Sequence, residues 1–462
     1  MATFYDVHFH AMNLSHPNIS AFLRRLNFWQ ILPILVSEKR DIVGEVIGAP
    51  LLEWQAGPIP NLLTMMENDI GSFFIILEYC LKEKKPKFSE GIKISSGDTK
   101  ETYTYDKIVL IPLIMDFGYK GINNGRYFYN IPPSKPVVEQ TIDLFNGIRK
   151  YCKYEMYKEN EEYTLKERSH DRAPLFEIYP FMGINTRNYR DDSEQKGEQK
   201  IEKILNQYFE DYRGDRESLY KNMGQFKGVG DDIISIRSNF FAGIKLYPPL
   251  GFNPWPESSD KMPDDPNYDY KTERKKVELL YEYCCNKKIP ITAHCGKLSY
   301  DVIPETCAHS LTSPEKWEKV LKNSKYSKLK LNLAHFGQQE KFLSRYLPET
   351  LSNYLPEKKE WEEKIIKLIS EYDNVYTDFS FRGCYPDYYK YLARLIKNDP
   401  KLATKLNSRV LFGSDFMINL VYIDSYNDYL EKFAITKFLT LEQKKLFCNS
   451  NPEKFLFNKL EE

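Results

Sequence analysis

Four histidines and one aspartate are the residues of this sequence best suited to metal chemistry. The chain has 7 histidines, and four of them lie in or directly after short apolar runs. Imidazole and carboxylate groups together bind zinc, and also manganese, iron or nickel. The pattern predicts a site for one or two divalent ions, most simply zinc, formed by His8, His10, His294, His335 and Asp415.

The spacing of these residues allows them to meet. Residues i and i+2 of a strand point to the same face, so His8 and His10 can bind one ion together. In a parallel barrel the carboxyl ends of all strands meet at one mouth, which would bring His294, His335 and Asp415 to the same place. The alternative is five separately hydrogen-bonded polar residues, each with its own partner beside the core.

Eight apolar runs are the predicted strands that would position these side chains. Most are near-continuous, which is typical of strands buried on both faces of a parallel sheet. Helical patterns alternate with the later runs, so the sequence predicts an α/β fold, a (β/α)8 TIM barrel, with a doubly wound open sheet as the alternative. The runs are Phe4–His10, Lys107–Met115, Leu175–Gly183, Phe241–Tyr247, Ile289–Cys295, Lys328–His335, Asn374–Ser380 and Arg409–Asp415.

The whole chain, residues 1–462, is predicted to be one domain with helical and loop insertions at about residues 30–105 and 185–232. The first insertion should hold helix around Asn61–Lys84 and a hairpin near Ile92–Tyr105, with its turn at Ser96-Gly97-Asp98. The second is polar and is a candidate cover for the barrel mouth. Helix-start residues and helical spacing predict helices at Asp269–Asn286, Ser313–Lys322, Glu360–Tyr372 and Thr440–Phe457.

Composition narrows the class of protein. Hydrophobic residues make up 42% and aromatic residues 15% of the chain, which is enough for a sizeable core. Lys+Arg 65 balance Asp+Glu 65, so nothing favours binding to nucleic acid or an anionic membrane, and a small-molecule substrate is expected. The 8 cysteines form no CxxC pair and no targeting signal is visible, which predicts free thiols and a cytoplasmic location. No oligomeric state is predicted.

The order of the ligand candidates resembles a known superfamily. HxH on the first strand, His on the fifth and sixth, and Asp on the eighth resemble the amidohydrolase superfamily, and AHCG, LAHFG and LFGSDF resemble its amidohydrolase-related TIM-barrel branch. The closing NPEKFL resembles the helix that often ends those chains. The resemblance covers Phe4–His10 and, more loosely, Phe241–Leu456. It implies that the five residues bind metal or contact metal-bound water.

Lys245, on the fourth predicted strand, is a position at which members of this superfamily differ. In binuclear members such as dihydroorotases, a lysine there reacts with CO2 and its carbamate bridges two metals. That reaction needs a neutral amine, so the lysine must be desolvated or lie beside cations. Decarboxylase-like members bind one metal without it. Lys245 is therefore either a carbamylated metal ligand or a lysine that pairs with an acid.

The resemblance also implies catalytic roles. A bound metal lowers the pKa of its water to about 7, and the resulting hydroxide attacks a carbonyl-type carbon. Asp415 would accept the proton of this water and pass it to the leaving group. His294 or His335 would polarise the substrate carbonyl or stabilise developing negative charge.

Weaker candidates lie near the predicted mouth. Tyr247, Arg382 and His309 are candidates for substrate binding, although a surface salt bridge suits Arg382 at least as well and a solvated loop suits His309 better. Asp6 shares the strand parity of His8 and His10, which makes it a candidate to support them or to bind a backbone group. Asp378 should either orient a ligand or hold a turn.

The sequence is compatible with three functions. The leading one is metal-dependent hydrolysis of an amide, lactone or ester-like bond in a small molecule. The second is a metal-dependent non-oxidative decarboxylase or hydratase of the same superfamily, for which Arg382 would be the carboxylate clamp. The third is a non-catalytic barrel used for binding or assembly. Absence of metal from the purified protein would favour this function.

Overall fold

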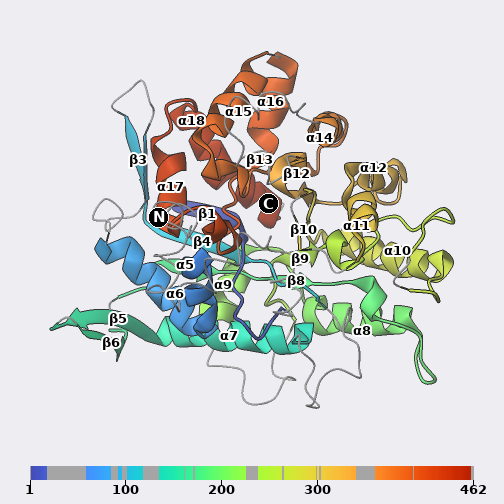
Figure 1. The fold of residues 1–462 in the computed structure, drawn as a ribbon, viewed down its shortest axis with the longest axis horizontal. Coiled ribbons are helices and arrows are strands. Elements are labelled where there is room, and N and C mark those ends of the chain that lie inside the picture. Colours follow the sequence, from blue (N-terminus) through green and yellow to red (C-terminus); the bar gives the residue numbers. More distant parts are fainter. Residues whose placement is uncertain are drawn as a thin grey trace, which may run out of the picture.

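Near-continuous apolar runs form parallel strands at the centre of the molecule, and helices lie around them (Figure 1). The computed structural model describes residues 2–17, 59–84, 92–95, 101–117, 135–160, 162–169, 172–224, 238–262, 265–297, 299–300, 303–339, 359–398 and 400–458. None of the helices in these ranges is both long and apolar enough to cross a bilayer. All 8 cysteines are free thiols, as predicted.

The strands form two parallel sheets. The first has the order β1-β4-β7, and the second has the order β13-β12-β11-β10-β9-β8. Nearly every residue of these strands is buried, because helices cover their outer face. The strands are β1 (Thr3–Phe9), β4 (Lys107–Pro112), β7 (Phe176–Ile178), β8 (Phe181–Gly183), β9 (Gly243–Leu246), β10 (Ile291–Ala293), β11 (Leu331–Leu333), β12 (Val375–Asp378) and β13 (Val410–Leu411).

The third predicted run, Leu175–Gly183, is not one strand. It forms β7, which pairs with β4, and β8, which pairs with β9. Pro180 lies between them and has no N–H group to donate to a neighbouring strand, so the ladder is interrupted there. The prediction of one continuous third strand was wrong, whereas each of the other seven runs contains one parallel strand.

Contacts join the two sheets at both edges. Leu113, just after β4, bridges to Phe181 of β8, and Phe9 of β1 bridges to Phe416, just after β13. The Val7 N–H also donates to the Phe412 carbonyl at 3.1 Å. The parallel strands therefore follow one another in sequence order, and the last lies beside the first.

The helices begin where their sequence signals predict. The side chains of Asp269, Ser313 and Thr440 accept hydrogen bonds from the first turns of α10, α12 and α18. The helices are α5 (Ile59–Glu67), α6 (Ile70–Tyr79), α7 (Val137–Lys153), α8 (Gly197–Phe209), α9 (Arg216–Gly224), α10 (Tyr270–Lys287), α11 (Glu305–Thr312), α12 (Pro314–Lys322), α14 (Glu360–Glu371), α15 (Pro386–Asn398), α16 (Pro400–Arg409), α17 (Tyr426–Ile435), α18 (Leu441–Lys445) and α19 (Asn451–Leu456).

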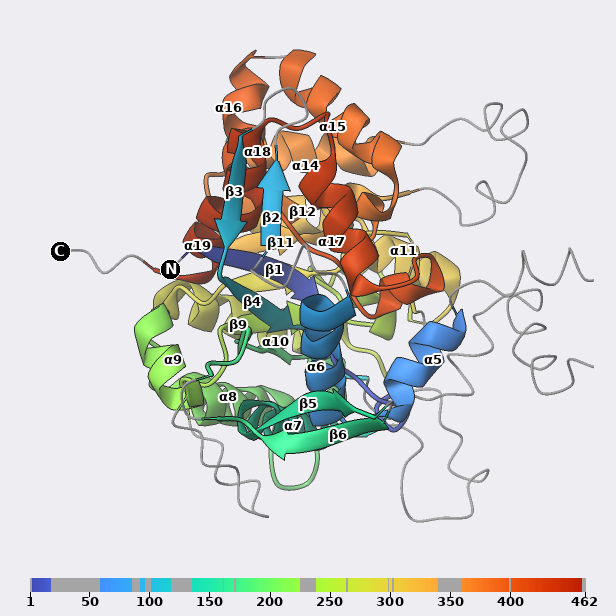
Figure 2. The same cartoon turned by 90° about the vertical axis from the view of Figure 1, so that its left-hand side faces the viewer.

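Two antiparallel hairpins accompany the parallel sheets (Figure 2). The predicted one is present as β2 (Ile92–Ser95) and β3 (Thr102–Tyr105), and its predicted turn at residues 96–98 lies outside the described residues. The other, β5 (Tyr154–Glu159) and β6 (Glu162–Glu167), was not predicted. The predicted helical part of the first insertion is present as α5 and α6.

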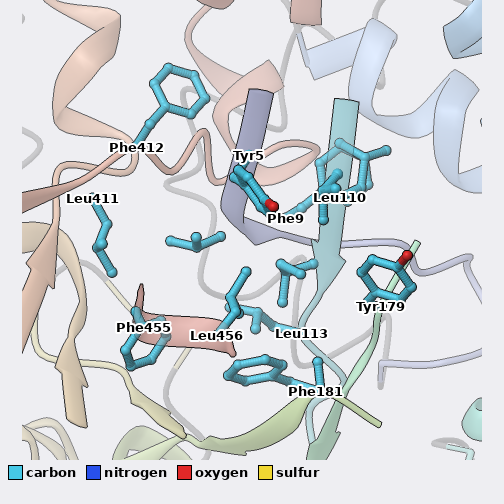
Figure 3. Close-up of a cluster of buried hydrophobic side chains, with 14 of the residues drawn as sticks. Tyr5, Phe9, Leu110, Leu113, Tyr179, Phe181, Leu411, Phe412, Phe455 and Leu456 are labelled. Carbon is cyan, nitrogen blue, oxygen red and sulfur yellow. The ribbon is translucent and has the colours of Figure 1, made fainter. Parts of the chain in front are cut away.

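Aromatic side chains in and just after the C-terminal helix pack against three strands of the core. The ring of Phe455 lies 6.4 Å from that of Phe181 in β8 and 5.2 Å from that of Tyr376 in β12. The ring of Phe457, just after the helix, lies 6.4 Å from that of Tyr5 in β1. Figure 3 shows Phe455 and Leu456 of α19 between Leu411 and Phe181. The NPEKFL segment, Asn451–Leu456, therefore packs against the apolar core.

Candidate metal centre

His8, His335 and Asp415 form the centre of the site. One possible ligand atom from each lies within 4.8 Å of those of the other two, and all three residues are buried. His8 lies on β1, His335 lies in the turn that follows β11 and Asp415 follows β13. Parallel strands that end at the same edge bring these residues together across more than 400 positions of sequence.

The two other predicted ligands flank this centre. The Nε2 atom of His10 lies 3.2 Å from Oδ1 of Asp415. The Nδ1 atom of His294 lies 2.9 Å from Nε2 of His335. The structure therefore places all five predicted ligands in one buried group, which we call the His/Asp cluster: His8, His10, His294, His335 and Asp415.

The backbone around the cluster is strained at three strand ends. His335, Phe381 and Asp415 have φ values of 62°, 63° and 60°, in the left-handed region that non-glycine residues rarely occupy. Each such residue costs roughly 1–3 kcal/mol and persists only where the surroundings require it. These residues follow β11, β12 and β13, so the strain is concentrated where the ligand candidates are presented.

Carbonyl groups determine which ring nitrogens of the flanking histidines carry hydrogen. Nδ1 of His10 lies 3.2 Å from the Leu113 carbonyl oxygen, and Nε2 of His294 lies 3.0 Å from that of Gly296. A carbonyl oxygen only accepts, so both of these nitrogens are N–H donors. The opposite nitrogens, Nε2 of His10 and Nδ1 of His294, therefore present lone pairs to the cluster.

This donor set fits a divalent metal. The lone pair on Nε2 of His10 and the carboxylate oxygen of Asp415 face one another at 3.2 Å. Two acceptors at that distance repel each other unless a cation or a proton lies near both. Imidazole nitrogens and a carboxylate are ligands for zinc and for other first-row divalent ions.

Asp378 and its neighbours hold the cluster in place. Nδ1 of His8 lies 3.1 Å from Oδ2 of Asp378, whose Oδ1 accepts from the backbone N–H of His335 at 3.1 Å. Asn332 donates to Oδ2 of Asp378 at 2.7 Å. Sequence reasoning considered Asp378 but missed Asn332 and Ser380. The one available signal for Ser380 was its i+2 spacing from Asp378, which places both side chains on one face.

Asp6 supports the backbone rather than the histidine rings. Its Oδ1 accepts from the backbone N–H of His8 at 3.3 Å and of Ser414 at 2.9 Å, and its Oδ2 accepts from the Tyr426 hydroxyl at 3.0 Å. The pairing of β1 with β4 shifts register between Asp6 and Phe9, so strict alternation does not hold there. Of the two predicted roles, the contacts of Asp6 match the binding of backbone groups, and these belong to His8 and to Ser414 beside Asp415.

Burial controls the charge of the cluster. Burial and the nearby charge of Lys245 lower the pKa of His8 to about 3, so the ring is neutral, which is the form that binds metals. Burial also lowers the pKa of His335 and His294. Burial by itself would raise the pKa of Asp415, but its contacts with the neighbouring histidine rings lower it overall. Asp415 is therefore an ionised carboxylate beside neutral imidazoles.

Lys245 lies inside this group. Its Nζ atom is 3.5 Å from Nε2 of His8, and the residue is 1% exposed. Burial lowers its pKa from 10.5 to about 8, although Asp378 and Asp415 act in the opposite direction. A substantial fraction of this amine is therefore neutral at mildly alkaline pH.

Replacing Lys245 with Met is expected to stabilise the metal-free protein at pH 7 by about 1–3 kcal/mol, since each pKa unit corresponds to about 1.4 kcal/mol. The folded chain binds this proton less tightly than the unfolded chain, so the penalty is complete below pH 8 and vanishes as pH approaches 10.5. Urea unfolding of both proteins at pH 7 and pH 9.5 measures the difference, which should shrink at the higher pH.

The matched control is Lys203→Met, on the exposed side of α8, which should change the free energy of unfolding by less than about 0.5 kcal/mol. If Lys245→Met destabilised the protein at pH 7, the buried ammonium would be making a net favourable ion pair.

The predicted substrate-binding residues have different surroundings. The ring of Tyr247 lies 4.6 Å from that of His294, so it is beside the cluster. The guanidinium of Arg382 donates to Glu362 at 2.6 Å and to the Phe336 carbonyl at 3.3 Å. His309 lies on α11, with Nε2 3.7 Å from Glu305 on the same helix. Of the three, the structure brings Tyr247 against the His/Asp cluster.

Sequence comparison assigns the family. Residues 231–457 match a sequence profile described as amidohydrolase, a range that contains His294, His335 and Asp415. The chain is a member of the amidohydrolase superfamily. This amidohydrolase is therefore an enzyme with hydrolase or a related activity. No curated protein matches the sequence.

Two solved structures are similar to this amidohydrolase at low identity. A probable 2-pyrone-4,6-dicarboxylic acid hydrolase from Acinetobacter baumannii, with citric acid bound, is 12% identical, with a TM-score of 0.31 over 80% of this chain and 95% of that chain. A dihydroorotase from Campylobacter jejuni is 13% identical, with a TM-score of 0.35 over 86% of this chain and 82% of that chain.

Proposed function

We propose that this amidohydrolase is a metal-dependent hydrolase that cleaves an amide, lactone or ester-like bond in a small molecule. The observation that carries the proposal is the buried convergence of His8, His335 and Asp415 within 4.8 Å. We propose further that the two sheets close into one (β/α)8 barrel, with the insertions as parts of a single domain. The bridges at both sheet edges support this closure.

The proposed ligands are the five residues of the His/Asp cluster, with zinc as the first choice of ion and manganese, iron or nickel as alternatives. When bound there, a divalent ion would lower the pKa of its water to about 7 and polarise a substrate carbonyl. The neutral state of the buried His8, His294 and His335 rings leaves their lone pairs available. Burial of the cluster excludes bulk water, which strengthens every electrostatic interaction inside it.

Asp415 is the proposed general base. Its carboxylate is ionised, and its Oδ1 lies 3.2 Å from Nε2 of His10 and 3.5 Å from Nε2 of His8. In this position it can accept a proton from the attacking water and pass it to the leaving group. His294 and His335 are the proposed groups that stabilise negative charge on the substrate oxygen.

Lys245 determines whether one or two ions are expected. A neutral amine 3.5 Å from His8 Nε2 meets the requirement for carbamate formation with CO2. We propose that Lys245 is carbamylated and that the loaded site holds two ions. A protonated Lys245 would correspond to a site with one ion.

The contacts of Arg382 help to distinguish hydrolysis from the alternative decarboxylase or hydratase reaction. Such an enzyme should use a cationic clamp for the substrate carboxylate, and Arg382 was the candidate. Its guanidinium is instead paired with the buried Glu362 and stacks 4.3 Å from the ring of Tyr388. This pairing occupies part of the guanidinium, so it supports hydrolysis over the decarboxylase or hydratase alternative. Tyr247, beside His294, remains the proposed substrate contact, and His309 is a more distant candidate.

Elemental analysis is the decisive experiment, on protein purified without chelators and supplied with bicarbonate and zinc. We expect two ions per chain and hydrolysis of at least one member of a panel of amides, lactones and esters. One ion per chain would replace the carbamate proposal with a single-metal site and raise the decarboxylase alternative. No ion after reconstitution with zinc or manganese would refute metal-dependent hydrolysis and favour a binding barrel.

A further inference from the structure

Two side chains at the end of β12, Asp378 on the strand and Ser380 just after it, contact ligand candidates from two other strands. Ser380 Oγ lies 3.1 Å from Nδ1 of His8 and 2.9 Å from Nδ1 of His335. Its hydroxyl donates to Oδ1 of Asp378, whose Oδ2 lies 3.1 Å from the same Nδ1 of His8. Asp378 and Ser380 are both fully buried, so water cannot replace these contacts.

Counting the protons in this group determines the tautomer of both rings. The single hydroxyl proton of Ser380 points to Asp378, so Ser380 Oγ presents only lone pairs to the histidines. The Asp378 carboxylate also only accepts: Oδ1 takes the backbone N–H groups of His335 and Ser380, and Oδ2 takes the Asn332 amide. Nδ1 of His335 lies in addition 3.3 Å from the Ser380 carbonyl oxygen, which likewise only accepts. His8 and His335 must therefore both carry hydrogen on Nδ1, which leaves Nε2 bare.

We propose that Asp378 and Ser380 form a tautomer clamp, which holds His8 and His335 with their Nε2 lone pairs directed into the His/Asp cluster. Both are positioning residues, because they act through the histidines. The inference rests on the proposed function only for the statement that these Nε2 atoms bind metal. Asn332, which donates to Oδ2 of Asp378 at 2.7 Å, holds the carboxylate in orientation.

The substitution Asp378→Asn is the most specific test, because backbone N–H groups fix the orientation of the new side-chain amide. Oδ1 of Asp378 accepts from the backbone N–H groups of His335 and Ser380, each at 3.1 Å, and these donors cannot change. The amide oxygen should stay there, so the NH2 group takes the place of Oδ2 and faces Nδ1 of His8, while the Asn332 amide turns its oxygen toward the new NH2 group. That arrangement favours hydrogen on Nε2 of His8, where the metal should bind.

The expected loss of metal affinity is about 10–100-fold, the usual effect of removing a group that orients a metal-binding histidine. Ser380→Ala removes the acceptor shared by the two rings and should give a smaller loss. Ser380→Thr keeps the hydroxyl and should restore most of the affinity. The matched control is Asp143→Asn, because Asp143 pairs with the buried His16 at 3.1 Å outside the cluster and should leave zinc affinity unchanged.

Two measurements on the full-length chain test the clamp. Competition with a chromophoric chelator gives the zinc Kd, and two-bond 1H–15N couplings of 15N-histidine-labelled, metal-free protein report the ring tautomers. We expect the Nδ1–H form at His8 and His335, and a shift toward Nε2–H at position 8 in Asp378→Asn. If the wild type bound no zinc, the proposed function would fail, while the tautomers would still test the clamp. Unchanged tautomers and unchanged Kd in both Asp378→Asn and Ser380→Ala would overturn it.

Discussion

Asp415→Asn is expected to lower kcat/KM by about a thousandfold or more, because it removes both a charged ligand and the proposed general base. The folded protein should tolerate this change. Asparagine adopts left-handed backbone more readily than most residues, which suits the φ of 60° at this position. Its amide can also donate to the bare Nε2 of His10, which lies 3.2 Å from Oδ1 of Asp415.

The measurements are kcat/KM with the best substrate from the panel, bound metal per chain, and the Tm of the metal-free protein. Asp415→Asn should lose activity with a Tm within a few degrees of wild type. Asp143→Asn serves as the control that keeps activity, because it changes a carboxylate paired with a histidine outside the cluster. Retention of a tenth or more of the wild-type activity in Asp415→Asn would exclude this residue as the general base.

Lys444→Met is expected to lower the free energy of unfolding by about 3 kcal/mol. The ammonium of this buried residue donates to three backbone carbonyl oxygens, those of Ser95, Ala434 and Thr436, at 2.6, 2.9 and 2.7 Å. Each buried acceptor left without a donor costs about 1–3 kcal/mol. Methionine fills the same space but offers no donor. The loss should be smaller than the summed cost of three unpaired carbonyl groups. The reason is that burial lowers the pKa of Lys444 to about 8 and so disfavours its charge.

This lysine joins three separate parts of the chain. It lies on α18, and its acceptors lie at the end of β2, in the last turn of α17 and just after that helix (Figure 2). Urea unfolding of metal-free protein tests the prediction, with Lys445→Met as the neighbouring control. Lys445 lies 4.7 Å from the centroid of the partly exposed Tyr103 ring, a contact worth about 0.5–1 kcal/mol. Equal losses in the two variants would contradict the proposed role of Lys444.

Several parts of the fold were predictable because their signals are local. Buried parallel strands need near-continuous apolar runs, and seven of the eight runs each contain one strand. Helix starts were equally clear, since Asp269, Ser313 and Thr440 must satisfy free N–H groups wherever the helices pack. The hairpin β5–β6 escaped detection because its strands are polar and mostly exposed, so no apolar pattern marks them.

The ligand candidates were also predictable, whereas their supporting contacts were not. Histidine and aspartate at strand ends are unusual enough to be noticed one at a time. The role of Ser380 depends on its position between Nδ1 of His8 and Nδ1 of His335, which no local pattern reveals. Arg382 shows the opposite case, because its position after a strand suggested substrate binding, and only the fold showed its pairing with Glu362.

By itself, the sequence determined the α/β architecture and the set of residues that converge, because strand parity and burial are properties of short segments. Only the tertiary structure decided the register shift between β1 and β4, and the split of the third strand at Pro180. It also decided which ring nitrogens face the His/Asp cluster. Those outcomes depend on hydrogen bonds between segments that are far apart in sequence, whose geometry is defined only when the sheets assemble.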